Sequence, residues 1–426
     1  MRQFARISFI IVCGSFFAIS SAVSCEWVGT WQLPSADQIL IGESDGQLVA
    51  TLPDGRIRGL RPAPNQSMAY GNALGDRANT SGSMLLVGAT NGSKSSGACE
   101  QLSWQDGAGS PVLARRIPHL EVEARFDNGN VSLSGTLYLP ISKEPVPAIV
   151  MAHGSGKELR SRSGLVFAFV ANGIAVLSFD KRGSGKSTGT WRASFTDYAA
   201  DLVSGVEWLR SRPEVNLTKI GAWGHSQGAW IAPLAASMSA NIAFVVAQAG
   251  GGVTPVEQDL FHSGNMLGLK TKLTPAQIAE VATFRRLKYD VLTGRAELAV
   301  YDAALEVARK QEWFRNVGAA LPNAEFWKTN AHYDPAATIA RVQCPLLFIL
   351  ADKDAYGPTE TMLKNIERVF AETRRPEQRV TVLRNANHAL FEADRLALLE
   401  DTLPATDRLA NGYQTLLLEW VRSRVR

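Results

Sequence analysis

Cysteine is scarce in this sequence, with four among 426 residues. No two are spaced Cys-x-x-Cys and none stands in a cluster of histidines, so the ligand pattern of a structural zinc site is missing. We therefore expect no metal and no cofactor. Cys344 begins an apolar run and is expected to be a buried thiol. Cys25 and Cys99 flank the first folded region, and in an oxidising compartment a disulfide between them is the natural prediction.

The sequence also has little excess charge and few long apolar runs. Its formal net charge of +4 is too small to predict binding to nucleic acid or to an anionic membrane surface, both of which need clustered basic residues. The longest apolar run, residues 7–19, is shorter than the roughly 20 residues of a membrane-spanning helix. We therefore expect no stable insertion into a membrane.

That apolar run lies in a segment with the three parts of a secretory signal peptide. Arg2 and Arg6 precede it, and the small residues 22–24 follow it, as signal cleavage requires. Residues 1–24 are predicted to be removed, and the mature protein to be periplasmic or secreted in a bacterium. An uncleaved anchor and a lipid on Cys25 are the alternatives.

Composition divides the remaining chain into two domains. Residues 25–115 are rich in Gly, Ser, Asn and Pro between short apolar stretches, which predicts a small β-rich domain. Residues 106–111 are its expected linker. Over residues 116–426, apolar runs alternate with helical stretches, which predicts an α/β domain with a mostly parallel sheet covered on both faces. A helical insertion at about 254–341 is expected to cover the site as a cap.

The strongest indication of chemistry is Gly-His-Ser-Gln-Gly at residues 224–228. It matches Gly-x-Ser-x-Gly, follows the apolar run Ile220–Trp223 and precedes the helical stretch Ala229–Met238. The motif requires this context, because its glycines allow a strained turn that raises the serine hydroxyl above the sheet. Ser226 is therefore the predicted nucleophile.

A serine hydroxyl needs a base to remove its proton and a carboxylate to orient that base. Among six histidines, His388 follows the last predicted strand. His262 is expected to be a surface or cap residue, and the sharp turn is expected to point His225 away. Asp352 and Asp354 both follow the predicted strand 346–350, so either carboxylate is a candidate.

The motifs of residues 120–426 together resemble those of α/β-hydrolases of the esterase and dienelactone-hydrolase-like group. The matching stretches are His-Gly-Ser-Gly at 153–156, Asp-x-Arg-Gly-x-Gly-x-Ser at 180–187, the serine motif at 224–228, Asp354 and His388. The exported layout with an added β-rich domain is similar to that of a bacterial esterase subgroup.

The resemblance implies a fold and a role for each site residue. It implies the α/β-hydrolase fold and the chain order Ser226, Asp, His388. In the family the catalytic acid lies three residues after a glycine. Ala351 stands at the glycine position here, so the resemblance implies Asp354 as the acid. Asp352 is then expected to be a turn residue. The backbone N–H groups of Ser155 and Gln227 are implied as the oxyanion hole.

The implied activity is cleavage of small-molecule carboxylic esters through an acyl-enzyme intermediate. A serine peptidase or a thioesterase of the same fold is the alternative. A binding module that has lost its catalytic activity is a more distant alternative, because every residue of the predicted triad is present. Residues 180–187 also nearly match a phosphate-binding loop, but Asp180 replaces its first glycine and no helix follows at once, which counts against nucleotide binding.

Overall fold

The structure is a computed structural model that describes residues 26–44, 46–87, 100–318, 324–375 and 377–426. The predicted signal peptide, Cys25 and Cys99 lie outside these ranges. Within them no helix combines the length and apolar character needed to cross a membrane. Cys344 is a free thiol that is half-buried rather than fully buried as expected, and desolvation still raises its pKa to about 11.

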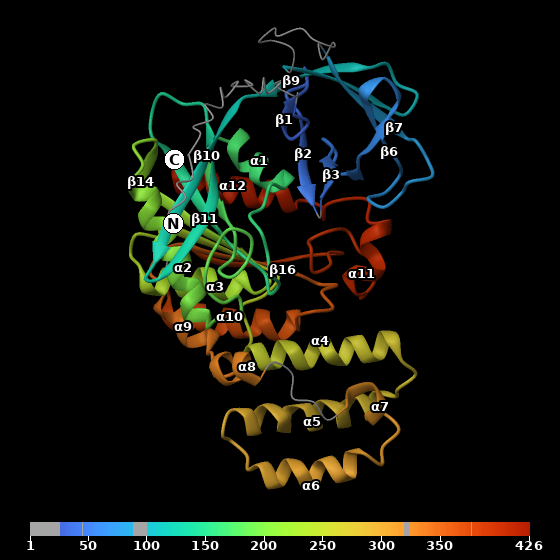
Figure 1. Cartoon of the computed structure of the whole chain (residues 1–426), viewed down its shortest axis with the longest axis vertical. Helices are drawn as coiled ribbons and strands as arrows, with labels where there is room; N and C mark the ends of the chain where they lie inside the picture. Colours follow the sequence, from blue (N-terminus) through green and yellow to red (C-terminus); the bar gives the residue numbers. More distant parts are fainter. Residues whose placement is uncertain (1–25, 45, 88–99, 319–323, 376) are drawn as a thin grey trace, which may run out of the picture.

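The N-terminal domain is a sheet of antiparallel strands, as its composition predicted (Figure 1). Alternate side chains, among them Trp31, Ile39 and Ile41, form its own apolar core. In chain order the strands are β1 (Gly29–Gln32), β2 (Gln38–Ser44), β3 (Gln47–Thr51), β4 (Ile57–Gly59), β5 (Arg61–Ala63), β6 (Ser67–Tyr70), β7 (Gly82–Val87), β8 (Gln101–Asp106) and β9 (Val112–Ile117).

The prediction of an interdomain linker at residues 106–111 is wrong. This stretch is the turn between β8 and β9, two strands that pair with each other in the sheet, and β9 also pairs with β1. The sheet therefore continues to Ile117, and His119 already begins the next sheet. Gly, Ser and Pro mark a hairpin turn as well as they mark a linker, and pairing across the turn decides between the two.

The second sheet has the strand order β10-β11-β13-β12-β14-β15-β16-β17. Its first three strands pair antiparallel and the others parallel, which confirms the expected α/β-hydrolase fold. The strands are β10 (His119–Asn128), β11 (Val131–Pro140), β12 (Val146–Ala152), β13 (Ala175–Phe179), β14 (Val215–His225), β15 (Phe244–Gln248), β16 (Leu346–Ala351) and β17 (Gln378–Leu383).

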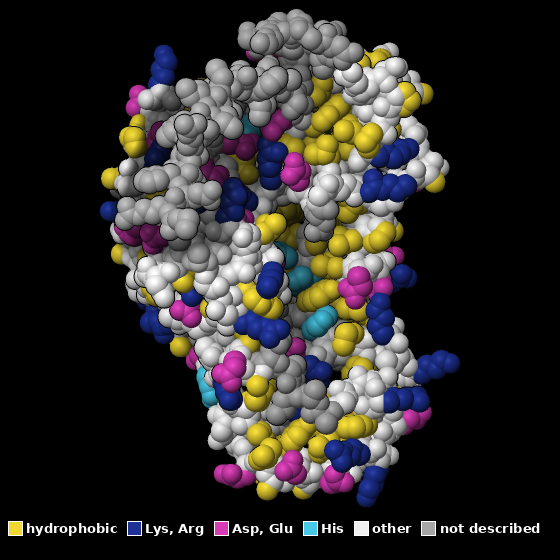
Figure 2. Space-filling model, viewed as in Figure 1, with side chains coloured by type: hydrophobic (Ala, Val, Ile, Leu, Met, Phe, Trp, Pro, Cys, Tyr) yellow, Lys and Arg dark blue, Asp and Glu magenta, His cyan; other side chains and the backbone are white. Residues whose placement is uncertain are grey.

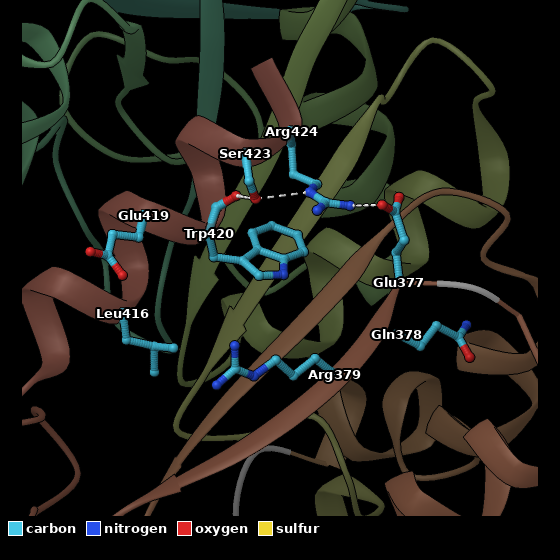
Figure 3. A pocket seen from close by; sticks show the side chains of 8 residues that line it. All are labelled: Glu377, Gln378, Arg379, Leu416, Glu419, Trp420, Ser423 and Arg424. Atoms are coloured by element: carbon cyan, nitrogen blue, oxygen red, sulfur yellow. Dashed lines mark hydrogen bonds and ion pairs between the residues drawn. The ribbon is translucent and has the colours of Figure 1, made fainter. Parts of the chain in front are cut away.

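Helices cover both faces of this sheet. One face packs on α1 (Gly164–Ala171) and α12 (Tyr413–Val425), and the other on α2 (Phe195–Arg210), α3 (Gly228–Met238), α9 (Pro335–Arg341) and α10 (Thr359–Thr373). Figure 3 shows how α12 meets the edge strand: Arg424 pairs with Glu377 beside β17, and its Nε donates to Ser423.

The inserted segment is helical, as predicted. It contains α4 (Pro255–Lys270), α5 (Pro275–Leu292), α6 (Leu298–Ala308), α7 (Phe314–Val317) and α8 (Ala324–Asn330). Thr274 and Gln277 form the expected capping box of α5. Figure 1 shows α4 beside the α/β domain, with α5 and α6 stacked outward from it. Trp313 and Trp327 lie in the apolar cores between these helices, so their role is packing.

The N-terminal sheet is joined to the α/β domain through main-chain and ionic contacts. The Glu43 N–H donates to the Arg162 carbonyl (2.9 Å), and the Ile57 N–H donates to the Asp407 carbonyl (2.6 Å). The guanidinium of Arg58, which is 3% exposed, pairs with the Asp407 carboxylate. These bonds hold the sheet against two segments that are far apart in sequence.

Candidate active site

Ser226 stands on a sharp turn between β14 and α3. Its φ of 57° lies in the left-handed region, which non-glycine residues rarely adopt. The turn is tight enough that a Cβ at Gly224 would lie 2.0 Å from the carbonyl oxygen of Gly228. The surrounding glycines thus permit a conformation that places the serine hydroxyl at the N-terminus of α3, as the motif predicted.

The structure brings Ser226, His388 and Asp354 together in one hydrogen-bonded chain. Ser226 Oγ lies 3.0 Å from His388 Nε2, and His388 Nδ1 lies 2.8 Å from Asp354 Oδ2. His388 and Asp354 are 5% and 2% exposed, so water competes little for these bonds. The arrangement is that of a nucleophile, a base and an orienting carboxylate.

Asp352 lies apart from this chain. Its Oδ1 accepts the N–H of Ala386 (3.2 Å), and its carboxylate lies within 4 Å of the amine of Lys353 (3.8 Å) and the guanidinium of Arg384 (3.9 Å). The side chain therefore acts as a turn acceptor between β16 and the His388 loop, the position that sequence reasoning gave it.

Two backbone N–H groups are free for an oxyanion. Within the described part of the chain, the N–H groups of Ser155 and Gln227 donate to no protein acceptor. The neighbouring Gly154 N–H, by contrast, donates to Glu158 (2.8 Å). Gln227 follows the serine and stands at the N-cap position of α3. The two predicted donors therefore remain available on the loops on which sequence reasoning placed them.

The comparison with protein families decides the family. The model described as X-Pro dipeptidyl-peptidase (S15 family) matches residues 128–389, which is more than half of the chain. The chain belongs to the S15 peptidase family. That family lies within the α/β-hydrolases, so the resemblance seen in the sequence is confirmed, and the chain is a serine hydrolase of this fold.

Individual relatives are more distant. The chain is 26% identical over 258 residues to the quorum-quenching protein AidA of Acinetobacter baumannii, covering 58% of this chain and 84% of AidA. It is 34% identical over 130 residues to the thiohydrolase aneE of Aspergillus aculeatus, covering 30% of this chain and 40% of that protein. A solved esterase of Pyrococcus furiosus is 19% identical with a TM-score of 0.46, covering 73% of this chain and 92% of the esterase chain.

Lys181 lies beside the predicted oxyanion donors of this S15 member, and the sequence analysis did not identify it as a site residue. Lys181 is 2% exposed. Its Nζ donates to the carbonyl of Gly154 (2.6 Å) and to the side-chain oxygen of Gln227 (2.8 Å), and it lies 4.5 Å from the ring centre of Tyr198. Desolvation lowers its pKa to about 8. The ammonium thus ties together the two loops that carry the donors.

Two histidines of this S15 member lie closer to the site than sequence reasoning placed them. The ring of His225 lies 5.0 Å from that of His388, and its Nε2 is 2.7 Å from the His388 carbonyl oxygen. Desolvation lowers the pKa of His225 to about 4, so the ring is neutral and donates. His262 on α4 stacks on Tyr356, which stacks on His388. His262 belongs to no motif, and His225 belongs to the serine motif at a position that the turn was expected to point away from the site, so only spatial neighbourhood identifies the two.

In the loop at residues 180–187, the carboxylate of Asp180 occupies the place that a bound phosphate would take. Asp180 accepts the N–H of Lys186 (2.9 Å) and pairs with Arg160 (3.0 Å), and α2 begins only at Phe195. A phosphate would need those N–H groups and a helix N-terminus directly after them. The phosphate-binding interpretation of this S15 chain therefore fails. Among the described residues, no group of acidic, histidine and cysteine side chains is placed to hold a metal ion.

Proposed function

We propose that this protein hydrolyses carboxylic esters of small molecules through an acyl-enzyme intermediate on Ser226. The observation that carries the proposal is the chain from Ser226 Oγ through His388 to the buried Asp354, with bonds of 3.0 and 2.8 Å. Neutral His388 takes the hydroxyl proton as Ser226 Oγ attacks the ester carbonyl.

The negative charge that develops on the carbonyl oxygen is stabilised by the N–H groups of Ser155 and Gln227. His388 then donates its proton to the leaving alcohol, and the carbon–oxygen bond to the alcohol breaks. Water, deprotonated by the same imidazole, attacks the acyl group on Ser226 and releases the acid. Asp354 orients the imidazole and stabilises its charged form in both halves of the reaction.

Export remains part of this proposal. Residues 1–24 have the layout of a signal peptide, so we infer that the enzyme works in the periplasm or outside the cell. There Cys25 and Cys99 are predicted to form a disulfide, which mass spectrometry of the exported protein would reveal as one bridged pair of peptides.

The family description makes dipeptidyl-peptidase activity the second candidate. A dipeptidyl-peptidase must neutralise the ammonium group of its substrate, which requires a carboxylate near the nucleophile. Glu158 lies beside the predicted oxyanion loop in a cavity of about 160 Å³, where its carboxylate accepts the Gly154 N–H (2.8 Å) and still has lone pairs for an ammonium group. Ester cleavage needs no such group and therefore stands first.

Substrate panels and one variant test the proposal. We expect p-nitrophenyl esters to be cleaved faster than Gly-Pro-p-nitroanilide. Ser226→Ala should reduce ester hydrolysis by several orders of magnitude, as loss of a triad residue does elsewhere. A fluorophosphonate should label the wild type at Ser226 alone. Faster cleavage of the anilide would favour the peptidase, and labelling at another residue would exclude Ser226 as nucleophile.

A further inference from the structure

A cavity of about 620 Å³ lies between the N-terminal sheet and the α/β domain; we call it the interdomain pocket. Figure 2 shows the hollow on the molecular surface, with histidine side chains along its course and hydrophobic side chains on its wall. The volume falls within the range of small-molecule binding sites. The chemical steps above make no use of it.

The wall on the N-terminal side comes from the alternation of two strands. Side chains of a strand point in turn to opposite faces of the sheet. Ile39 and Ile41 of β2 and Ala50 of β3 point into the core of the N-terminal sheet. The alternate residues of the same strands, Leu40, Gly42, Ser44, Gln47, Val49 and Thr51, line the pocket. The sheet therefore has one face for its own core and a second face for this cavity.

The opposite wall is also largely apolar. It is formed by Leu165 and Ala168 of α1, by Leu390 and Phe391 after His388, and by Leu409. Among the described lining residues Glu43 alone carries a full charge, and its carboxylate pairs with Arg162 (3.1 Å). A pocket without an unpaired charge fits an uncharged, apolar ligand.

The inner end of the pocket is built from residues that touch the site. His225 and Gln248 line it. His225 precedes the nucleophile and contacts the His388 ring, and the Gln248 carbonyl accepts the Ser226 N–H (2.9 Å). Ala389, which also lines the pocket, directly follows His388. The pocket therefore borders the residues that directly precede Ser226, follow His388 and hold the Ser226 N–H.

We propose that the interdomain pocket binds the aliphatic chain of the substrate ester, which makes the N-terminal sheet part of the substrate-binding machinery. This inference rests on the proposed esterase function. The substrate class is an ester with an uncharged, apolar chain, and the wall formed by β2 and β3 limits how long that chain can be.

Two variants of Val49 on β3 test the proposal in opposite directions. Val49→Trp fills the pocket and should lower the ratio of kcat/KM for p-nitrophenyl octanoate over p-nitrophenyl acetate at least tenfold, because each buried methylene is worth roughly fourfold. Val49→Ala enlarges the pocket and should move the preferred chain toward dodecanoate. Damage to the fold lowers all rates together and does not lengthen the preferred chain.

The matched control is Leu113→Trp on β9, which adds the same ring to the N-terminal sheet at a position that is 51% exposed and should leave the chain-length profile unchanged. A series of n-alkyl acetates assayed on all variants shows whether the chain belongs to the acid or to the alcohol, and a shift in either series supports the proposal. The proposal would be overturned if the Val49 variants kept the wild-type chain-length profile with both the p-nitrophenyl esters and the n-alkyl acetates. Absence of any ester hydrolysis in the wild type would instead refute the esterase function.

Discussion

The carboxylate of Asp354 is oriented by three hydrogen bonds. Its Oδ2 lies against His388 Nδ1, while its Oδ1 accepts the N–H groups of Tyr356 (2.7 Å) and Gly357 (3.1 Å). The two backbone donors fix the direction of the side chain, so that Oδ2 has a single orientation toward the imidazole. Asp352, two residues earlier, uses its carboxylate to hold the main chain at Ala386.

We therefore expect the two aspartates to respond very differently to the same change. Asp354→Asn should lower kcat on the order of 10⁴-fold, because an amide stabilises the wrong tautomer of the histidine. Asp352→Asn keeps an oxygen for the Ala386 N–H and should lower kcat only a few-fold. Steady-state kinetics of the two purified variants measure the difference, and a larger loss for Asp352→Asn would reverse the assignment.

Lys181 places a positive charge behind the predicted oxyanion hole without touching the substrate. It holds the Gly154 carbonyl and the Gln227 side chain, each next to a predicted N–H donor. We regard it as a positioning residue. Since desolvation lowers its pKa to about 8, the ammonium is present below that pH and is lost as the pH rises through it.

Lys181→Met should lower kcat about tenfold, less than the loss of a direct oxyanion donor. In the wild type, kcat should also decline as the pH rises above about 8, and the variant should lack this decline. Lys186→Met is the control, because its side chain belongs to the same loop but is 70% exposed. An unchanged decline in Lys181→Met would remove the lysine from this role.

The turn at Ser226 depends on two glycines to different degrees. A Cβ at Gly224 would lie 2.0 Å from the Gly228 oxygen, whereas a Cβ at Gly228 would lie 3.0 Å from the Ala152 oxygen. The first contact cannot be relieved without moving the backbone that carries the nucleophile. The second needs a shift of only a few tenths of an ångström.

Gly224→Ala should therefore slow labelling by a fluorophosphonate at least about 10²-fold, as a displacement near 1 Å of a reacting group does. Gly228→Ala should slow it far less. Labelling rates, with circular dichroism to confirm that both variants fold, test this order. Equal rates in the two variants would show that the turn adapts to a side chain at position 224.

Strands, helices and the serine turn were predictable because each has a local signal. Apolar runs mark β12 to β17, and the Thr274 capping box marks α5. Ser226, Asp354 and His388 were predictable because each follows a strand end. Lys181, His225 and His262 were not, since their roles arise from neighbours distant in sequence. The turn at 106–111 was misjudged because its composition is the same in a hairpin and in a linker.

Ion pairs and hydrogen bonds of Arg58 and Arg162 connect the two domains, beside the apolar contacts of Val28 and Leu40 with α1. Arg58 is 3% exposed and pairs with Asp407 across the interface, where its guanidinium also donates to the Asp407 carbonyl (3.0 Å). Arg162 adds contacts to Glu26 (2.7 Å), Glu43 (3.1 Å) and Glu121 (3.0 Å). The Arg162 side chain is 22% exposed against 4% for that of Arg58, so its ion pairs contribute less.

Arg58→Ala should lower the free energy of unfolding by about 2 kcal/mol, because it removes charge-assisted hydrogen bonds from a buried position. Arg309→Ala, which removes an exposed pair with Glu306 on α6, should change it by less than about 0.5 kcal/mol. Urea denaturation followed by tryptophan fluorescence compares them. Similar losses in the two variants would mean that Arg58 does not secure the interface.

The bonds between Ile57 or Arg58 and Asp407 have a consequence for the order of events during synthesis. Arg58 and Asp407 are 349 positions apart, so the ribosome completes the N-terminal sheet long before it makes this part of the surface on which that sheet docks. Contacts of such separation form late in folding. The wall of the interdomain pocket formed by Leu390, Phe391 and Leu409 is therefore made last, and the pocket is closed only when this late segment meets the sheet that was made first.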